Sequence, residues 1–180
     1  CKKKNDLNAS GIEGGSLSSQ HVNVFTQHND NFRTGWNARE SELTTVNLDT
    51  AHFGLLHSLA VDDQVFAQPL VAANLMINGG RHNVLLIATV NNTVYAFDGD
   101  DGTMYWTRNF TRSGGRAVLN ADMTFACGGN YLDFSGKMGI VGTPVIDTLA
   151  NALFFVARSL LNDASGKNFY QDLHKIDLRT

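Results

Sequence analysis

Proline, cysteine and long apolar runs are all scarce in this sequence. A membrane-spanning helix needs about 18 or more apolar residues in a row, and the longest apolar run here covers only residues 152–157. Two cysteines, Cys1 and Cys127, are too few for a disulfide-rich scaffold. Basic residues are also outnumbered, and the net charge of −3 argues against a nucleic-acid partner, which needs a clustered basic face. With these classes excluded, the composition, in which 43% of the residues are hydrophobic, is typical of a globular domain.

Short apolar segments separated by turn residues make up most of the chain. Strands are predicted over residues 21–26, 53–61, 65–72, 83–90, 93–98 and 104–110. Asn78-Gly79-Gly80, Asn91-Asn92 and the run from Gly99 to Gly102 separate them, and such residues accept positive φ or bond their own backbone. The pattern predicts an all-β, antiparallel fold. The single helix that we expect, over residues 40–50, has only a weak signal.

Part of this pattern occurs twice. The strand that begins near Pro69 is echoed near Pro144, and the strand that ends at Asp98 is echoed by one that ends at Asp177. Self-similarity of this kind is typical of a repeat array in which each unit packs on the next. Residues 111–138 are polar, rich in glycine and outside both copies, so they are predicted to be an insertion.

The segment from Ala96 to Trp106 carries a resemblance to a known family. It is similar to the tryptophan-docking motif, Ala-x-Asp-x-x-x-Gly-x-x-x-Trp, of the PQQ-type (quinoprotein alcohol dehydrogenase-like) β-propellers. Physically, Asp98 is expected to accept turn N–H groups, Gly102 to supply a positive φ, and Trp106 to cover the seam between blades. A second copy runs up to Thr180 without reaching its glycine.

Residues 25–35 resemble the segment that opens such propellers. The resemblance implies an opening segment at 21–52, a first blade at 53–110 and a second, truncated blade at 139–180, separated by the insertion. The expected fold is therefore about two four-stranded antiparallel blades, the N-terminal part of a larger β-propeller.

The first 20 residues are small and polar, apart from a few scattered apolar residues, and predict a flexible tether. Cys1 at their start resembles the lipid-bearing cysteine of a mature bacterial lipoprotein. This implies a periplasmic or outer-membrane lipoprotein of the bacterial cell envelope, with the membrane as a partner through lipid on Cys1. Cys127 is given no role.

Candidate site residues are few. The densest polar cluster contains His28, Asn29, Asp30 and Arg33, which could line a cavity but more often satisfy backbone groups. The aspartates around Gly99 lack the spacing of a calcium-binding EF-hand loop, so no metal site is predicted. No catalytic constellation is found, and no cofactor is expected.

By resemblance, the function expected first is non-catalytic binding or assembly at the envelope, with other proteins or the rest of its own propeller as partners. The alternative is a quinoprotein-like dehydrogenase whose residues for PQQ and calcium lie downstream. That family holds its quinone against an adjacent Cys-Cys pair, which is missing here. A third possibility is an extracellular propeller that binds polysaccharide or protein.

Overall fold

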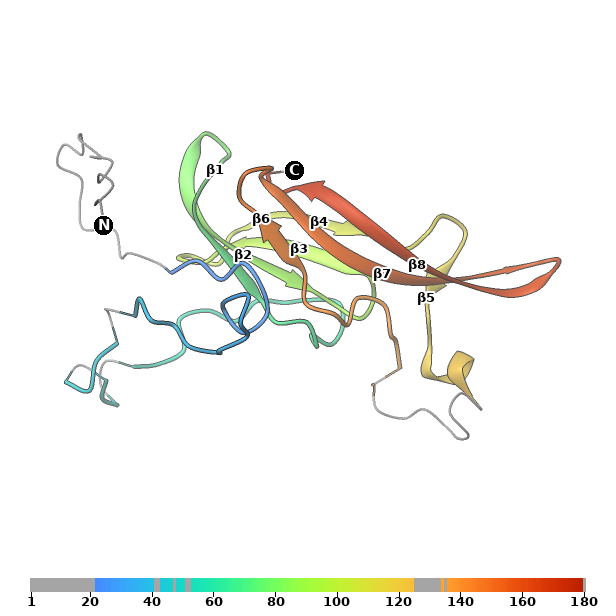
Figure 1. Ribbon diagram of the computed structural model, residues 1–180, viewed down its shortest axis with the longest axis horizontal. Helices are drawn as coiled ribbons and strands as arrows, with labels where there is room; N and C mark the ends of the chain where they lie inside the picture. The colour runs from blue at the N-terminus through green and yellow to red at the C-terminus, as the bar shows by residue number, and fades with distance from the viewer. Residues whose placement is uncertain are drawn as a thin grey trace, which may run out of the picture.

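The fold is all-β and antiparallel, as predicted. The computed structural model describes residues 22–40, 43–46, 48–50, 53–124, 134 and 136–179. Within these residues the strands form two four-stranded sheets, and a short 3-10 helix, η1 (Asn120–Met123), is the only helical segment (Figure 1). The chain therefore contains two blade-like sheets.

The first sheet is a simple antiparallel meander. Its strands β1 (Leu70–Ile77), β2 (Gly80–Ala88), β3 (Thr93–Asp98) and β4 (Met104–Asn109) are neighbours in chain order. The turns between them use the residues that the sequence predicts, because Asn78, Asn92 and Gly102 have φ of 50°, 62° and 80°. These values lie in the left-handed region that Asn and Gly tolerate best.

The second sheet is built around a long hairpin, β7 (Ala152–Asp163) and β8 (Gly166–Asp177), which projects from the body in Figure 1. Because β8 pairs with one edge of β7 over its whole length, β6 (Val145–Asp147) and β5 (Arg116–Ala117) share the other edge. The order β6-β7-β8 repeats β1-β2-β3, which explains the sequence echo.

The two sheets pack face to face on one core. Alternation along a strand sends successive side chains to opposite faces, so Leu86 and Ala96 of the first sheet meet Leu153 and Phe155 of the second. All four are buried. The opening segment closes one end of this interface, where Val24 bridges Val71 of β1 and the Phe25 carbonyl accepts the Ile146 N–H of β6.

Three local predictions were wrong, and the first is the strand expected at 21–26, of which the described residues form only an isolated bridge at Val24. The described residues between 40 and 50 form turns and bends and no helix, in keeping with their weak periodicity. Residues 53–61 form no strand; instead Leu59 and Val61 lie against the far face of the first sheet, on Tyr95 and Phe97. The predicted insertion, residues 111–138, contributes to the second sheet, because Arg116 and Ala117 supply β5.

Candidate functional site

Asp98 ends β3 and holds the turn that follows. Its Oδ1 accepts the backbone N–H of Asp100 at 2.7 Å and of Asp101 at 3.3 Å. Gly102 then takes a positive φ, and its N–H returns to the Asp98 carbonyl at 3.0 Å. Asp177 ends β8 in the same way, accepting the Arg179 N–H at 2.9 Å. In both copies of the repeat, therefore, an aspartate at the end of the strand accepts backbone N–H groups of the turn that follows.

Tyr105 and His82 join Asp98, although no local pattern predicts this contact. The second carboxylate oxygen accepts the Tyr105 hydroxyl, and it lies 2.9 Å from His82 Nδ1. Burial acts to raise the pKa of Asp98, but these hydrogen bonds outweigh it and leave the pKa below its ordinary value. Burial and the same carboxylate raise the pKa of Tyr105. The register of β2 and β4 against β3 brings these side chains together, which is a tertiary effect.

Trp106 joins the two sheets. It lies on β4, directly opposite Ala96 of β3, and packs against the shared core. Its indole N–H donates to the carbonyl of Leu178, just after β8, at 3.1 Å. The side chain is half-buried rather than enclosed. All four predicted motif residues therefore contribute to the turn after β3 or to the contact between the sheets: Ala96, Asp98, Gly102 and Trp106.

The polar cluster at His28, Asn29, Asp30 and Arg33 lies in a tight loop, in which Asp30 and Arg33 form hydrogen bonds with neighbouring residues of the loop. The Arg33 guanidinium donates to Thr26 Oγ1 at 2.6 Å and to the Gln27 carbonyl at 2.8 Å. Asp30 accepts the hydroxyl and the N–H of Thr34. These bonds hold the backbone of the opening segment, and the four residues line neither the cavity beside the insertion nor the one between the opening segment and β1.

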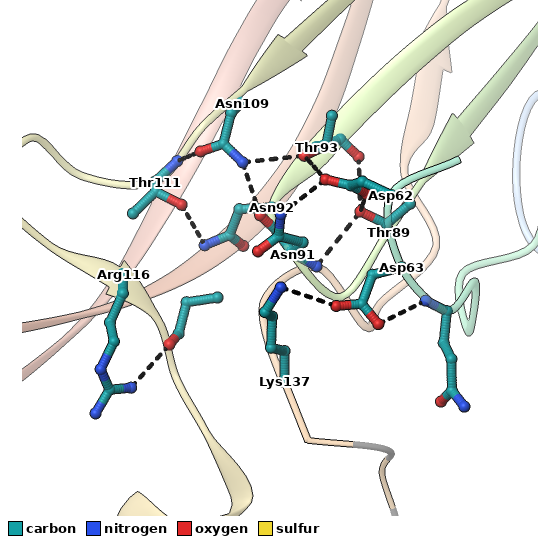
Figure 2. A network of polar contacts seen from close by, with 12 residues as sticks. Asp62, Asp63, Thr89, Asn91, Asn92, Thr93, Asn109, Thr111, Arg116 and Lys137 are labelled. Atoms are coloured by element: carbon teal, nitrogen blue, oxygen red, sulfur yellow. Dashed lines mark hydrogen bonds and ion pairs between the residues drawn. The ribbon is translucent and has the colours of Figure 1, made fainter. Parts of the chain in front are cut away.

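A second polar network, drawn in Figure 2, centres on Asp62. Its carboxylate accepts Thr89 Oγ1 at 2.7 Å, Asn91 Nδ2 at 2.7 Å and Thr93 Oγ1 at 2.5 Å. Burial acts to raise the pKa of Asp62, and the three donors together bring it below the ordinary value. The carboxylate thus ties the segment before β1 to the β2–β3 turn.

The neighbouring Asn92 links the two sheets. It is fully buried, and its side-chain amide donates to the Arg158 carbonyl of β7 at 2.8 Å. Its backbone carbonyl accepts the Phe110 N–H at 2.8 Å. The bond to Arg158 therefore joins the β2–β3 turn of the first sheet to the middle of β7, and Figure 2 shows the same amide beside Thr111.

The outer face of the second sheet is uncovered over part of its area. Val145, Phe154, Val156, Leu173 and Lys175 share this face, because directly paired residues point the same way. Val145, Val156 and Leu173 are 43%, 40% and 72% exposed. We call these five residues the outer face.

Farther along the same face, the insertion covers the hairpin and leaves a cavity of about 570 Å³. Arg158 and Gln171, a cross-strand pair, lie on its floor together with Phe169. The remaining described lining comes from the insertion and the edge of β8: Val118, Asp122, Met123, Thr124, Met138 and Tyr170.

Asp122 is the buried charge of this wall, with its side chain only 4% exposed. It accepts two bonds from the Arg116 guanidinium, at 2.5 and 2.7 Å, and one from Lys167 Nζ at 3.1 Å. The Arg116 guanidinium, above all, holds the pKa of this carboxyl far below its usual range. The short η1 helix is held in place by this pairing.

Within the described part of the chain, no cluster of His, Cys, Asp and Glu side chains is arranged to hold a metal ion. Nor do these residues include a helix long and apolar enough to cross a membrane. Cys1, with its expected lipid, and Cys127 lie outside the described residues. Comparison with known protein families and with curated protein sequences finds no match to this chain.

Proposed function

We propose that this chain is a non-catalytic binding or assembly module, made of two propeller-type blades, that docks another β-sheet on its outer face. The observation that carries the proposal is the unequal covering of the two sheets. In the first sheet the central strand β3 is buried along its whole length, by the second sheet on one face and by Leu59 and Val61 on the other. The second sheet is covered on its inner face and, at Leu160, by the insertion, but Val156 and Leu173 on the rest of its outer face remain exposed.

The chemistry of the outer face favours a protein partner of sheet type. Val145, Phe154, Val156 and Leu173 present branched and aromatic groups from paired positions of β6, β7 and β8. The inner faces of the two sheets are packed with the same residue types. Burying an exposed Leu or Val side chain contributes about 1.5–3 kcal/mol, so a second sheet laid across this face would be held firmly.

The polar groups support the non-catalytic part of the proposal. Asp98, Asp62 and Asp30, the carboxylates of the clusters described above, each accept bonds from their own turns or from neighbouring strands. Such groups are already used for structure. The location at a bacterial cell envelope rests on the resemblance in sequence alone.

Site-specific photo-crosslinking in the native cell tests this function. A photo-reactive amino acid in place of Leu173 is expected to give a discrete covalent adduct with a protein. The matched control is Leu149, which is 97% exposed in the β6–β7 turn and does not belong to the outer face. The same adducts from both positions, or none from position 173, would contradict the proposal.

A further inference from the structure

The cavity beside the insertion combines apolar walls with a cation, Arg158, whose side chain pairs with none of the described residues. Val118, Met123, Met138 and Phe169 supply the apolar part of the lining. Among the described residues, the Arg158 guanidinium has no hydrogen bond or ion pair, although the Arg158 carbonyl accepts the Asn92 amide. Arg112, by contrast, pairs with Asp172.

The charge balance at the cavity is positive. Arg116 and Lys167 both contact Asp122, so the single carboxylate of the lining is already neutralised by two cations. Arg158 adds a third cation on the floor. An anion that entered the cavity would therefore meet an excess of positive charge and no uncompensated carboxylate among the described lining residues.

The position of Arg158 is set by the hairpin. Arg158 pairs with Gln171, and Leu160 pairs with Phe169 one step farther along the same face. Leu160 is buried under Val118 and Met138 of the insertion. A ligand lying along this face would thus contact Phe169 with its apolar body, and Arg158 and the Gln171 amide with its polar end.

We propose that this cavity binds a small apolar molecule that carries a carboxylate, with Arg158 as the group that recognises the charge. The volume of about 570 Å³ lies within the range of small-molecule sites, about 300–1,000 Å³. Arginine suits the role because its planar guanidinium can donate two parallel bonds to a carboxylate. The cavity adjoins the outer face, but this proposal does not rest on the docking of a protein there.

Calorimetric titration of the full chain with two probes, 2-naphthoate and octanoate, tests the proposal. At least one probe is expected to bind saturably at one site, and its neutral amide to bind at least tenfold more weakly. Arg158→Gln should weaken binding of the anion by about 10- to 100-fold, the usual worth of a hydrogen bond to a charged group, and leave the amide almost unchanged.

Arg108→Gln is the matched control, since Arg108 is exposed on β4 and does not line the cavity. Its affinity for the anion should equal that of the wild type, and the thermal unfolding of both variants should show that each is folded. The proposal is overturned if neither carboxylate binds at millimolar concentration, if the amides bind as well as the anions, or if the two arginine variants behave alike. None of these results bears on crosslinking at position 173.

Discussion

At the scale of single residues, the buried Asp98 carboxylate connects a turn, a tyrosine and a histidine. Asp98→Ala leaves the Tyr105 hydroxyl and the Asp100 N–H without their acceptor. We expect it to lower the free energy of unfolding by about 2–4 kcal/mol, because unsatisfied buried donors carry a full desolvation cost. Chemical denaturation measures this value.

Asp147→Ala is the matched control for that variant. Asp147 also holds a turn, accepting the Leu149 and Ala150 N–H groups at 2.9 and 3.1 Å, but no side-chain donor reaches it in the described residues. Its loss should be about 1 kcal/mol, as for a cap-type bond. Equal losses for the two variants would show that Tyr105 and His82 add nothing.

His174 is expected to make stability depend on pH. Its ring packs against both Phe155 and Phe110, and burial lowers its pKa below the ordinary 6.5 even though the nearby Asp172 opposes the shift. Below pH 6.5 the unfolded chain therefore binds more protons than the folded chain, and stability falls as pH falls toward the folded-state pKa.

His174→Phe should remove this contribution. Urea denaturation at pH 7.5 and pH 5.5 is expected to show a smaller loss of stability for the variant than for the wild type. A phenyl ring can stack on Phe155 as the imidazole does. It also removes the buried Nε2, which has no hydrogen-bond partner within the described structure. An unchanged pH dependence would show that His174 is not the titrating group.

At the scale of elements, Gly139 fits where the insertion passes the β2–β3 turn. Its N–H donates to the Val90 carbonyl at 2.8 Å, and a Cβ there would lie only 2.5 Å from that oxygen and even closer to the Asn92 side chain. Gly139→Ala should cost about 1–3 kcal/mol or more, as overpacking does. Gly142→Ala, where a Cβ meets nothing within 4 Å, should cost almost nothing.

Trp106 makes the corresponding contact between β4 and the end of β8. Since the indole is half-buried, Trp106→Ala should lose about 2–4 kcal/mol, somewhat less than a fully enclosed tryptophan. Trp106→Phe removes mainly the bond to the Leu178 carbonyl and should lose about 1 kcal/mol. Trp36→Ala, at a side chain that is 71% exposed, serves as the control in thermal denaturation and should be neutral.

At the scale of the whole molecule, the two sheets share one core and should unfold together. Leu153 of β7 is fully buried against the first sheet, so Leu153→Ala should cost about 2–5 kcal/mol. Hydrogen exchange should show equal loss of protection in β2 and β7, because both sheets depend on the same contacts. Protection lost in β7 alone would show that the sheets are separate folding units.

Several elements were predictable because their signals are local. The strand over residues 93–98 coincides with β3, and the strand expected at 104–110 differs from β4 by one residue. Here the turn residues Asn92 and Gly102 set both ends. The strand expected at 65–72 was shifted, since pairing with β2 begins only at Leu70 and runs to Ile77.

Other parts of the fold depend on contacts far apart in sequence. Residues 53–61 alternate well enough for a strand, but no strand of the described residues pairs with them through its backbone. They pack instead as an irregular segment on Tyr95 and Phe97. The cavity was missed for the same reason. Arg158 and Met138 are ordinary residues in the sequence, and only the pairing of β5 with β7 places the insertion above the hairpin.

The sequence by itself determined the all-β class, the turn at Asp98 and the repetition of the strand order, because turn residues and alternation act within a few positions. Only the tertiary structure decided which groups meet. It joined Asp98 to His82 and Tyr105, placed Asn92 against β7, and placed the Arg158 guanidinium at a cavity, without a partner among the described residues. The physical reason is that strand register and sheet packing bring together residues that no local pattern relates.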